Sequence, residues 1–222
     1  MKTPHLVIFD LDHTLLNGDS SELWAAEMTR LGWVEDVDGF KAQHQALMQT
    51  YATGNLDMEA YLTLSLDPLK GKSYQEVAKV AEEFVKTQLL HRLYDQGLEL
   101  IRRLRIEGHH LLMISASESF LVEPVARSMG FDGVIGIEPE LDDCCFTGRP
   151  ILPMSYQDGK VHHSRLYAQQ MDINDWPVSF YSDSHNDIPL LEVVDIPIAV
   201  NPNMNLANVA KKRGWTILKF EC

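Results

Sequence analysis

Acidic side chains follow the first apolar run of the chain. The segment His5–Leu16 reads HLVIFDLDHTLL, which places Asp10, Asp12 and Thr14 at alternate positions after Leu6–Phe9. Because alternate side chains of an extended chain share a face, the two carboxylates should point the same way. Neighbouring carboxylates repel, and one stays protonated unless a cation lies between them. The pair suits nucleophilic, acid–base or metal chemistry, although residues 12–14 also suit an ordinary turn.

Three later segments contribute residues that can contact phosphate or a cation. Ser115 follows an apolar run and precedes an expected helix, so its hydroxyl suits a phosphate oxygen or the helix N-cap equally. Lys160 lies in a first helical turn, where it opposes the helix dipole. Neutralising a phosphate and a carboxylate would explain that position, and a solvated lysine is the alternative. Asp183, Asn186 and Asp187 share one loop, and such oxygen ligands suit Mg²⁺.

These residues predict phosphoryl transfer when they are taken together. Asp10 is the candidate nucleophile, forming an aspartyl-phosphate that water then hydrolyses, and Asp12 is the candidate proton shuttle. Asp183 is expected to complete a Mg²⁺ site with Asp10 and the backbone carbonyl of Asp12. Asp187 is expected to hold Lys160 through a charged hydrogen bond.

Short apolar runs alternate with helical patterns along most of the chain. This alternation predicts βαβ units and a mostly parallel sheet covered on both faces, with the site beyond the carboxyl ends of the strands. The expected strands are Leu6–Phe9, His110–Ile114, Gly133–Ile137, Val178–Tyr181, Ile196–Val200 and Trp215–Leu218. The expected helices are Gln96–Glu107, Glu118–Met129, Lys160–Met171, Ile188–Val194 and Asn205–Arg213.

One segment, residues 17–92, has helical patterns and no good strand. The simplest topology is a Rossmann-like, three-layer α/β core at 1–16 and 93–222 with an inserted all-helical cap at 17–92, which would lie over the site as a lid. Residues 138–158 are irregular; a small hairpin fits near Cys145–Gly148, and we assign the segment no role. The expected cap helices are Ser21–Leu31, Phe40–Tyr51, Met58–Leu66 and Tyr74–Leu89.

Charge and composition restrict the class of partner. The 222 residues include 32 acidic and 19 basic side chains, a net charge of −13, which disfavours nucleic acid and anionic membranes. Cys144, Cys145 and Cys222 lack the spacing of a metal site, and reduced thiols are expected. The sequence shows neither a signal peptide nor a membrane span. We expect a cytoplasmic protein, a monomer or weak dimer, that acts on a small molecule.

The order of these motifs resembles that of the haloacid dehalogenase superfamily, and the cap is similar to the C1 cap of its phosphoserine-phosphatase-like branch, subfamily IB. The resemblance covers essentially the whole chain. It implies a Rossmann-like core, Mg²⁺ dependence and a phospho-aspartate intermediate. The residues carried over are Asp10, Asp12 and Asp183 for Mg²⁺, Ser115, Lys160 and Asn186 for phosphate, and Thr14 and Asp187 in support.

Two details refine this resemblance. Asp12 argues against dehalogenases, which lack the second aspartate. Ser182 and Ser184 stand where the last motif of the family usually has glycines, which is a departure in the loop and not in the carboxylates.

The cap suggests the substrate class. Phosphoserine phosphatases carry an acidic residue shortly after the first motif that reads the substrate ammonium; Asp19 falls there, although it equally suits a helix N-cap. Their cap arginine, which grips the substrate carboxylate, is replaced by Ser65, and no arginine lies between Arg30 and Arg92. The surrounding pattern is matched by Gly54, Leu56, Glu59 and Leu62, with Met58 in place of an aromatic residue.

Losing an arginine that binds the substrate carboxylate through two hydrogen bonds changes substrate specificity strongly. We therefore expect a Mg²⁺-dependent phosphomonoesterase acting on a small amine-bearing ester without a free α-carboxylate, such as histidinol phosphate, phosphoethanolamine or phosphocholine. The alternatives are a phosphoserine phosphatase, a phosphotransferase that passes the phosphoryl group to another alcohol, and a non-catalytic phosphate-binding module, which the intact catalytic residues disfavour.

Overall fold

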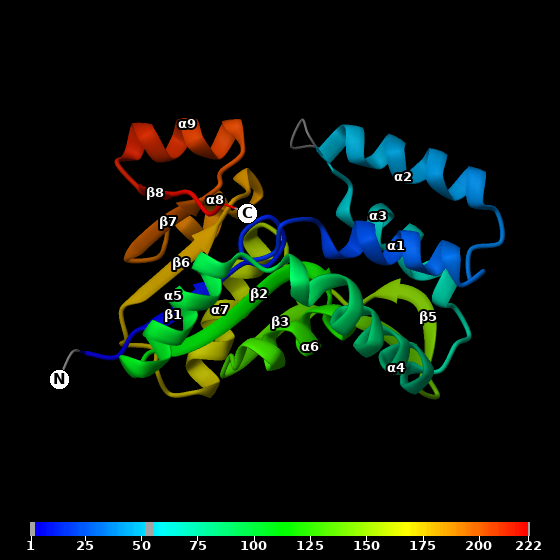
Figure 1. Ribbon diagram of the computed structural model, residues 1–222, viewed down its shortest axis with the longest axis horizontal. Coiled ribbons are helices and arrows are strands. Elements are labelled where there is room, and N and C mark those ends of the chain that lie inside the picture. Colours follow the sequence, from blue (N-terminus) through cyan, green and yellow to red (C-terminus); the bar gives the residue numbers. More distant parts are fainter. Residues whose placement is uncertain (1–2, 52–55, 222) are drawn as a thin grey trace.

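A parallel six-stranded sheet forms the centre of the molecule (Figure 1). The computed structural model describes residues 3–51 and 56–221. The strand order is β3-β2-β1-β6-β7-β8, so the three strands that precede the predicted site residues are neighbours. The strands are β1 (Leu6–Phe9), β2 (His110–Glu118), β3 (Gly133–Ile137), β6 (Val178–Ser182), β7 (Ile196–Val200) and β8 (Thr216–Leu218).

Alternate residues of the central strands pack in two separate hydrophobic clusters, one on each face of the sheet. Val7 and Phe9 of β1 belong to one cluster, and Leu6 and Ile8 to the other. The first cluster includes residues of α5 and α6, and the second includes residues of α7, α8 and α9, so helices cover both faces of the sheet. This confirms the predicted three-layer α/β architecture. The covering helices are α5 (Asp95–Ile106), α6 (Ser119–Met129), α7 (Asp158–Gln170), α8 (Ile188–Leu191) and α9 (Met204–Arg213).

Helices follow one another between β1 and α5. Three of them begin at a side-chain cap, in which Asp19, Asp57 or Ser73 accepts a hydrogen bond from a backbone N–H. The helix predicted for Tyr74–Leu89 changes at Val85 into a five-residue π-helix, Val85–Leu89. The helices are α1 (Ser20–Arg30), α2 (Val37–Tyr51), α3 (Met58–Leu66) and α4 (Tyr74–Phe84), with 3₁₀ turns at Asp67–Leu69 and Leu90–Arg92.

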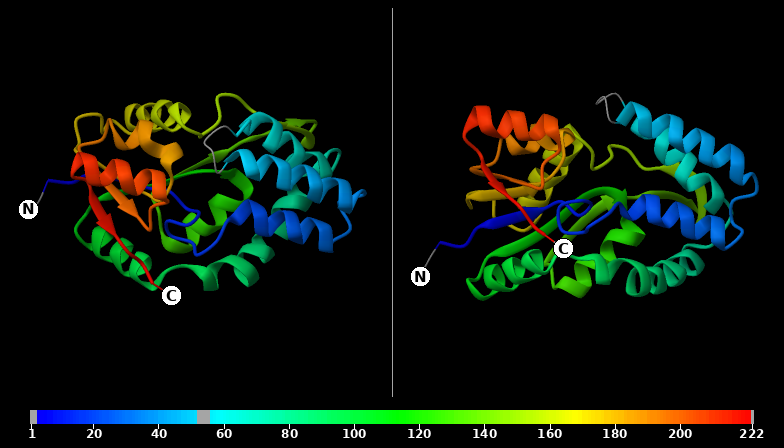
Figure 2. Two further views of the ribbon diagram at one scale, coloured as in Figure 1. Left: turned by 90° about the horizontal axis from the view of Figure 1, so that it is seen from above. Right: turned by 45° about the horizontal axis from the view of Figure 1, so that its top comes forward.

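The two ends of this helical segment lie side by side and are joined by backbone hydrogen bonds. Leu16 and Leu93 form an isolated antiparallel bridge, and Asn17 N donates to Arg92 O at 2.9 Å. The helices α1, α2 and α3 lie beyond one end of the sheet, as two further views also show (Figure 2).

A two-stranded antiparallel hairpin, β4 (Pro139–Asp142) and β5 (Cys145–Pro150), occupies part of the irregular segment. Its β5 strand lies against the helical segment: Phe146 exchanges backbone hydrogen bonds with Gly71 and Lys72, and Tyr74 N donates to Cys144 O. A hairpin was predicted here, but its contact with the helices was not.

Two remaining sequence expectations concern cysteines and membranes. Cys144 and Cys145 are free thiols, whereas Cys222, like Gly54 of the predicted cap motif, lies outside the described residues. Among the helices of residues 3–51 and 56–221, none is long and apolar enough to cross a membrane.

Candidate active site

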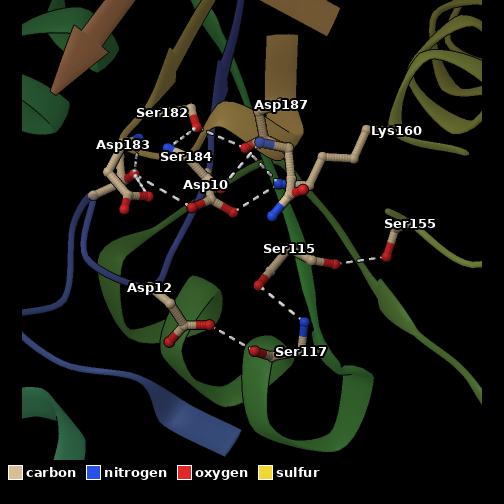
Figure 3. Close-up of polar contacts among 12 residues, drawn as sticks. Asp10, Asp12, Ser115, Ser117, Ser155, Lys160, Ser182, Asp183, Ser184 and Asp187 are labelled. Atoms are coloured by element: carbon tan, nitrogen blue, oxygen red, sulfur yellow. Dashed lines mark hydrogen bonds and ion pairs between the residues drawn. The ribbon is translucent and has the colours of Figure 1, made fainter. Parts of the chain in front are cut away.

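A buried lysine joins two aspartates at the carboxyl end of the sheet (Figure 3). Lys160 Nζ lies 2.8 Å from Asp10 Oδ1 and 2.8 Å from Asp187 Oδ2. Lys160 is only 2% exposed, which excludes the solvated alternative. Ser182 Oγ donates to the same Asp187 oxygen at 2.6 Å, so this carboxylate is held from two sides.

Lys160 reaches this position because of the way α7 begins. A Cβ on Gly159 would overlap the carbonyl oxygen of Met154, so only glycine lets the first turn lie this close to the preceding loop. A lysine in a first turn is unfavourable for the helix dipole. The two carboxylates offset that cost here.

Thr14 connects the loops that follow β1 and β6. Its Oγ1 lies 3.3 Å from Asp10 Oδ2 and 3.2 Å from Asp183 Oδ1, and it accepts a hydrogen bond from the backbone N–H of Asp183 at 2.9 Å. Thr14 is fully buried. It therefore fixes the separation of two carboxylates that come from distant parts of the sequence.

Asp12 turns toward a different set of partners from Asp10. Its carboxylate accepts hydrogen bonds from Ser117 Oγ at 2.5 Å, from the backbone N–H of Ser20 at 2.6 Å and from Ser20 Oγ at 3.1 Å. Both aspartates line the same cavity, as their alternation predicts, but their hydrogen bonds are separate. Neither Ser20 nor Ser117 was predicted, because isolated serines carry no pattern that distinguishes them from surface residues.

Ser115 lies at a β-bulge and not at a helix N-cap. Strand β2 was expected to end at Ile114, but it continues to Glu118, and its register with β3 shifts between these two residues. Helix α6 begins only at Ser119, which excludes the N-cap reading. Bulges change the direction of side chains near active sites, and here the bulged segment carries Ser115 and Ser117 into the lining of the cavity.

The side-chain amide oxygen of Asn186 accepts hydrogen bonds, whereas its amide nitrogen donates none to the described residues. Its Oδ1 accepts from Tyr156 Oη at 3.0 Å and lies 3.3 Å from Gln157 Nε2. Its Nδ2 is buried and has no hydrogen-bond partner among the described residues. Tyr156 and Gln157 come from the irregular segment to which the sequence assigned no role.

The cavity between these loops and the helical segment encloses about 620 Å³, part of it open to solvent. Asp10, Asp12, Lys160 and Asn186 line it, and Tyr61 and Met58 of α3 contribute from the helical side. No arginine is found among the described residues that line it.

Asp19 is both a helix cap and part of the cavity lining. Its Oδ1 accepts from the backbone N–H of Glu22 at 2.8 Å, so the capping interpretation is correct, and the side chain also lines the cavity. Beside it, Ser21 Oγ donates to Glu118 Oε2 at 2.7 Å. Glu118 is 1% exposed and was not anticipated as a site residue.

Burial dominates the electrostatics of the acidic groups. It raises the pKa of Asp10 to about 7, with Lys160 lowering that value and Asp187 raising it. Burial raises the pKa of Asp12 to about 6, and the nearby Asp19 adds to the effect. The pKa of Asp183 is also well above its ordinary value, because of burial and of repulsion from Asp10. Burial would lower the pKa of Lys160, but Asp10 and Asp187 reverse that effect and raise it.

The donor set around Asp10 and Asp183 fits a hard cation. Two carboxylates that resist ionisation because they are buried together gain from a cation, and oxygen donors suit Mg²⁺. Within the described part of the chain, no three or more His, Cys, Asp and Glu side chains group into a metal site. Backbone carbonyl, water and phosphate oxygens would therefore complete the coordination.

Comparison with known proteins agrees with this geometry. The family model of haloacid dehalogenase-like hydrolases matches residues 7–192. The chain belongs to this family. The family assignment confirms the resemblance that the motifs predicted.

Similar proteins narrow the class within the haloacid dehalogenase-like hydrolases. The chain is 34% identical to a histidinol-phosphatase of Neisseria meningitidis, over 98% of this chain and 99% of that one. It is 31% identical to phosphoserine phosphatase SerB1 of Mycobacterium tuberculosis, over 96% of this chain and 70% of that one. A crystal structure of a protein of unknown function from Bordetella pertussis superposes with a TM-score of 0.89 at 35% identity, covering 98% and 99% of the two chains. The chain is a phosphatase of the phosphoserine-phosphatase-like type.

Proposed function

We propose that this phosphatase hydrolyses a small, amine-bearing phosphomonoester, with histidinol phosphate as the leading candidate. The observation that carries the proposal is the composition of the cavity wall: an acidic side chain, Asp19, lines it, and no arginine does among the described residues. An anionic wall attracts a cationic leaving group, whereas a substrate carboxylate there would have no partner. Ser65, at the position of the carboxylate-reading arginine, is buried and lies outside this lining.

The catalytic roles follow from the contacts described above. Asp10 attacks the phosphorus, and Lys160 helps to keep it ionised by lowering its pKa. Asp12, with a pKa of about 6, donates a proton to the leaving alcohol and later takes one from the water that hydrolyses the aspartyl-phosphate. Ser115, Lys160 and Asn186 contact the phosphate oxygens.

Mg²⁺ is the proposed cofactor. Asp10, Asp183 and the backbone carbonyl of Asp12 would hold it, and Thr14 and Asp187 keep these ligands and Lys160 in place. The ion supplies positive charge that offsets the charge of the carboxylates and the phosphate.

A panel of phosphomonoesters at saturating Mg²⁺ tests the proposal. We expect kcat/KM for histidinol phosphate to exceed that for L-phosphoserine, with phosphoethanolamine and phosphocholine as further amine-bearing substrates. The similarity to SerB1 makes phosphoserine the strongest competing substrate. A clear preference for phosphoserine would overturn the proposal that the substrate bears an amine but no free α-carboxylate. Asp10→Asn should abolish turnover of every ester while circular dichroism shows an intact fold. Activity that persists in this variant would contradict the mechanism.

A further inference from the structure

Residues 155–157, which we call the 155–157 strap, contact both loops proposed to bind phosphate. Ser155 Oγ donates to the backbone carbonyl of Ser115 at 2.5 Å. The next two residues reach the other loop, because Tyr156 and Gln157 both donate to Asn186 Oδ1. Lys160 follows on the same stretch of chain, in the first turn of α7.

The hydrogen-bond directions within the strap determine which way the amide of Asn186 faces. Gln157 Nε2 also donates to Tyr156 Oη at 3.2 Å, which leaves the tyrosine proton for Asn186 Oδ1. An amide nitrogen only donates, so an atom that receives two donors must be the oxygen. Asn186 therefore presents Nδ2, and not Oδ1, on its remaining side.

That free nitrogen indicates a ligand. Asn186 is 5% exposed, and its Nδ2 has no protein partner within the described residues, although leaving a buried donor unpaired is costly. The residue lines the cavity that contains Asp10 and Lys160, where a phosphate oxygen would accept the missing hydrogen bond. The strap itself is strained, because Gln157 has φ 48° and ψ −121°, a conformation that residues other than glycine seldom adopt.

We propose that Tyr156 and Gln157 are positioning residues that hold the amide of Asn186 with its Nδ2 directed at the substrate phosphate. The proposal rests on the proposed phosphatase site and adds to it two residues that do not touch the reacting atoms in this role. Without them the Asn186 amide can turn, and its oxygen would then face the phosphate and repel it. Tyr156 thus acts through Asn186.

A double-mutant cycle tests this coupling, with inorganic phosphate as a competitive inhibitor whose inhibition constant reports binding without turnover. Tyr156→Phe should raise the inhibition constant and KM about tenfold and change kcat less, because a contact made equally in the ground and transition states affects binding alone. Asn186→Ala should raise both values at least as much. In the Asn186→Ala background, Tyr156→Phe should have no further effect.

Gln157→Met supplies a second route if Tyr156→Phe folds poorly, since it removes the donor and keeps the side-chain length. It should give the same direction of change, again only when Asn186 is present. Tyr167→Phe is the matched control: its hydroxyl forms a hydrogen bond with His110 Nε2 at 2.7 Å, and the residue lies on α7 outside the cavity lining. It should leave the inhibition constant unchanged.

Two results would overturn the proposal. One is an unchanged inhibition constant in folded Tyr156→Phe and Gln157→Met. The other is an effect of Tyr156→Phe that persists in Asn186→Ala, which would mean that the tyrosine contacts the ligand directly. Failure of the phosphatase mechanism would be recognised separately, by turnover in Asp10→Asn.

Discussion

Lys160 Nζ lies 2.8 Å from Asp10 Oδ1, and both groups are almost completely shielded from solvent. A buried ion pair contributes little net stability, but removing one member leaves an uncompensated charge. The pair therefore makes activity and folding depend on the same lysine.

Lys160→Met should test that dependence. Lys160 lowers the pKa of Asp10, so without the cation that pKa rises. As the pH increases, the unfolded chain then releases this proton more readily than the folded protein does, and the variant loses stability. We expect kcat to fall at least about 100-fold. The free energy of unfolding should fall by up to about 3–5 kcal/mol at pH 8 and by less at pH 5.5, where Asp10 can protonate. Urea unfolding in metal-free buffer measures this, with the exposed Lys212→Met as control. An equal loss at both pH values would contradict the prediction.

Asp183→Asn should weaken the response to Mg²⁺. The substitution removes one proposed anionic ligand and keeps the shape of the side chain, so we expect the Mg²⁺ concentration for half-maximal activity to rise at least about tenfold. EDTA-treated wild-type enzyme should lose activity and regain it when Mg²⁺ is added. An unchanged Mg²⁺ requirement in the variant would exclude Asp183 as a ligand.

Asp12→Asn tests whether Asp12 acts as the proton donor to the leaving alcohol. A general acid matters most when the leaving alcohol is basic, so hydrolysis of an alkyl phosphate should slow by about 10²–10⁴-fold. With p-nitrophenyl phosphate, whose leaving group needs no proton, the initial burst of p-nitrophenol should be largely retained and the later steady state slowed. Equal loss of the burst and of alkyl ester hydrolysis would show that Asp12 has another role.

Asp19→Asn distinguishes the two functions of this residue. Asparagine retains the capping hydrogen bond to Glu22 N and removes the negative charge. We expect stability to change little, and kcat/KM to fall about 10–100-fold for an amine-bearing ester but not for glycerol phosphate. Unchanged kcat/KM for both esters would mean that Asp19 serves only the helix, and a parallel loss for both would mean that its charge does not select the amine.

Glu118→Gln should change how stability depends on pH. Burial raises the pKa of Glu118 above its ordinary value, so the unfolded chain ionises this residue before the folded protein does. Wild-type stability should therefore fall relative to the variant as pH rises above the ordinary glutamate value of 4.5, and the two should converge below it. Urea unfolding between pH 4 and 8 measures the difference, with the exposed Glu76→Gln as control. A constant difference would show that Glu118 is not penalised by burial.

The sheet could be predicted from sequence because its central strands are apolar on both faces. Four-residue β1 is buried throughout, so its boundaries coincide with a continuous apolar run. The end of β2 was missed, since the polar segment at residues 115–118 reads as a helix start, whereas the fold uses it as a bulged strand.

Side chains that act through hydrogen bonds to other polar groups were the hardest to anticipate. Ser20 and Ser117 become partners of Asp12 only when three distant segments meet. Tyr156 lies in an irregular stretch whose conformation depends on contacts with Ser115 and Asn186, so no local periodicity marks it.

The bridge between Leu16 and Leu93 makes the helical insertion a closed module, with its two ends side by side. Such an arrangement allows one insertion to be exchanged for another without altering the core. The β4–β5 hairpin adds a condition, because its backbone hydrogen bonds to residues 71, 72 and 74 join a later part of the chain to the same module. A chimera designed to transfer substrate preference would have to carry the hairpin along with residues 17–92, or leave an open strand edge in the recipient.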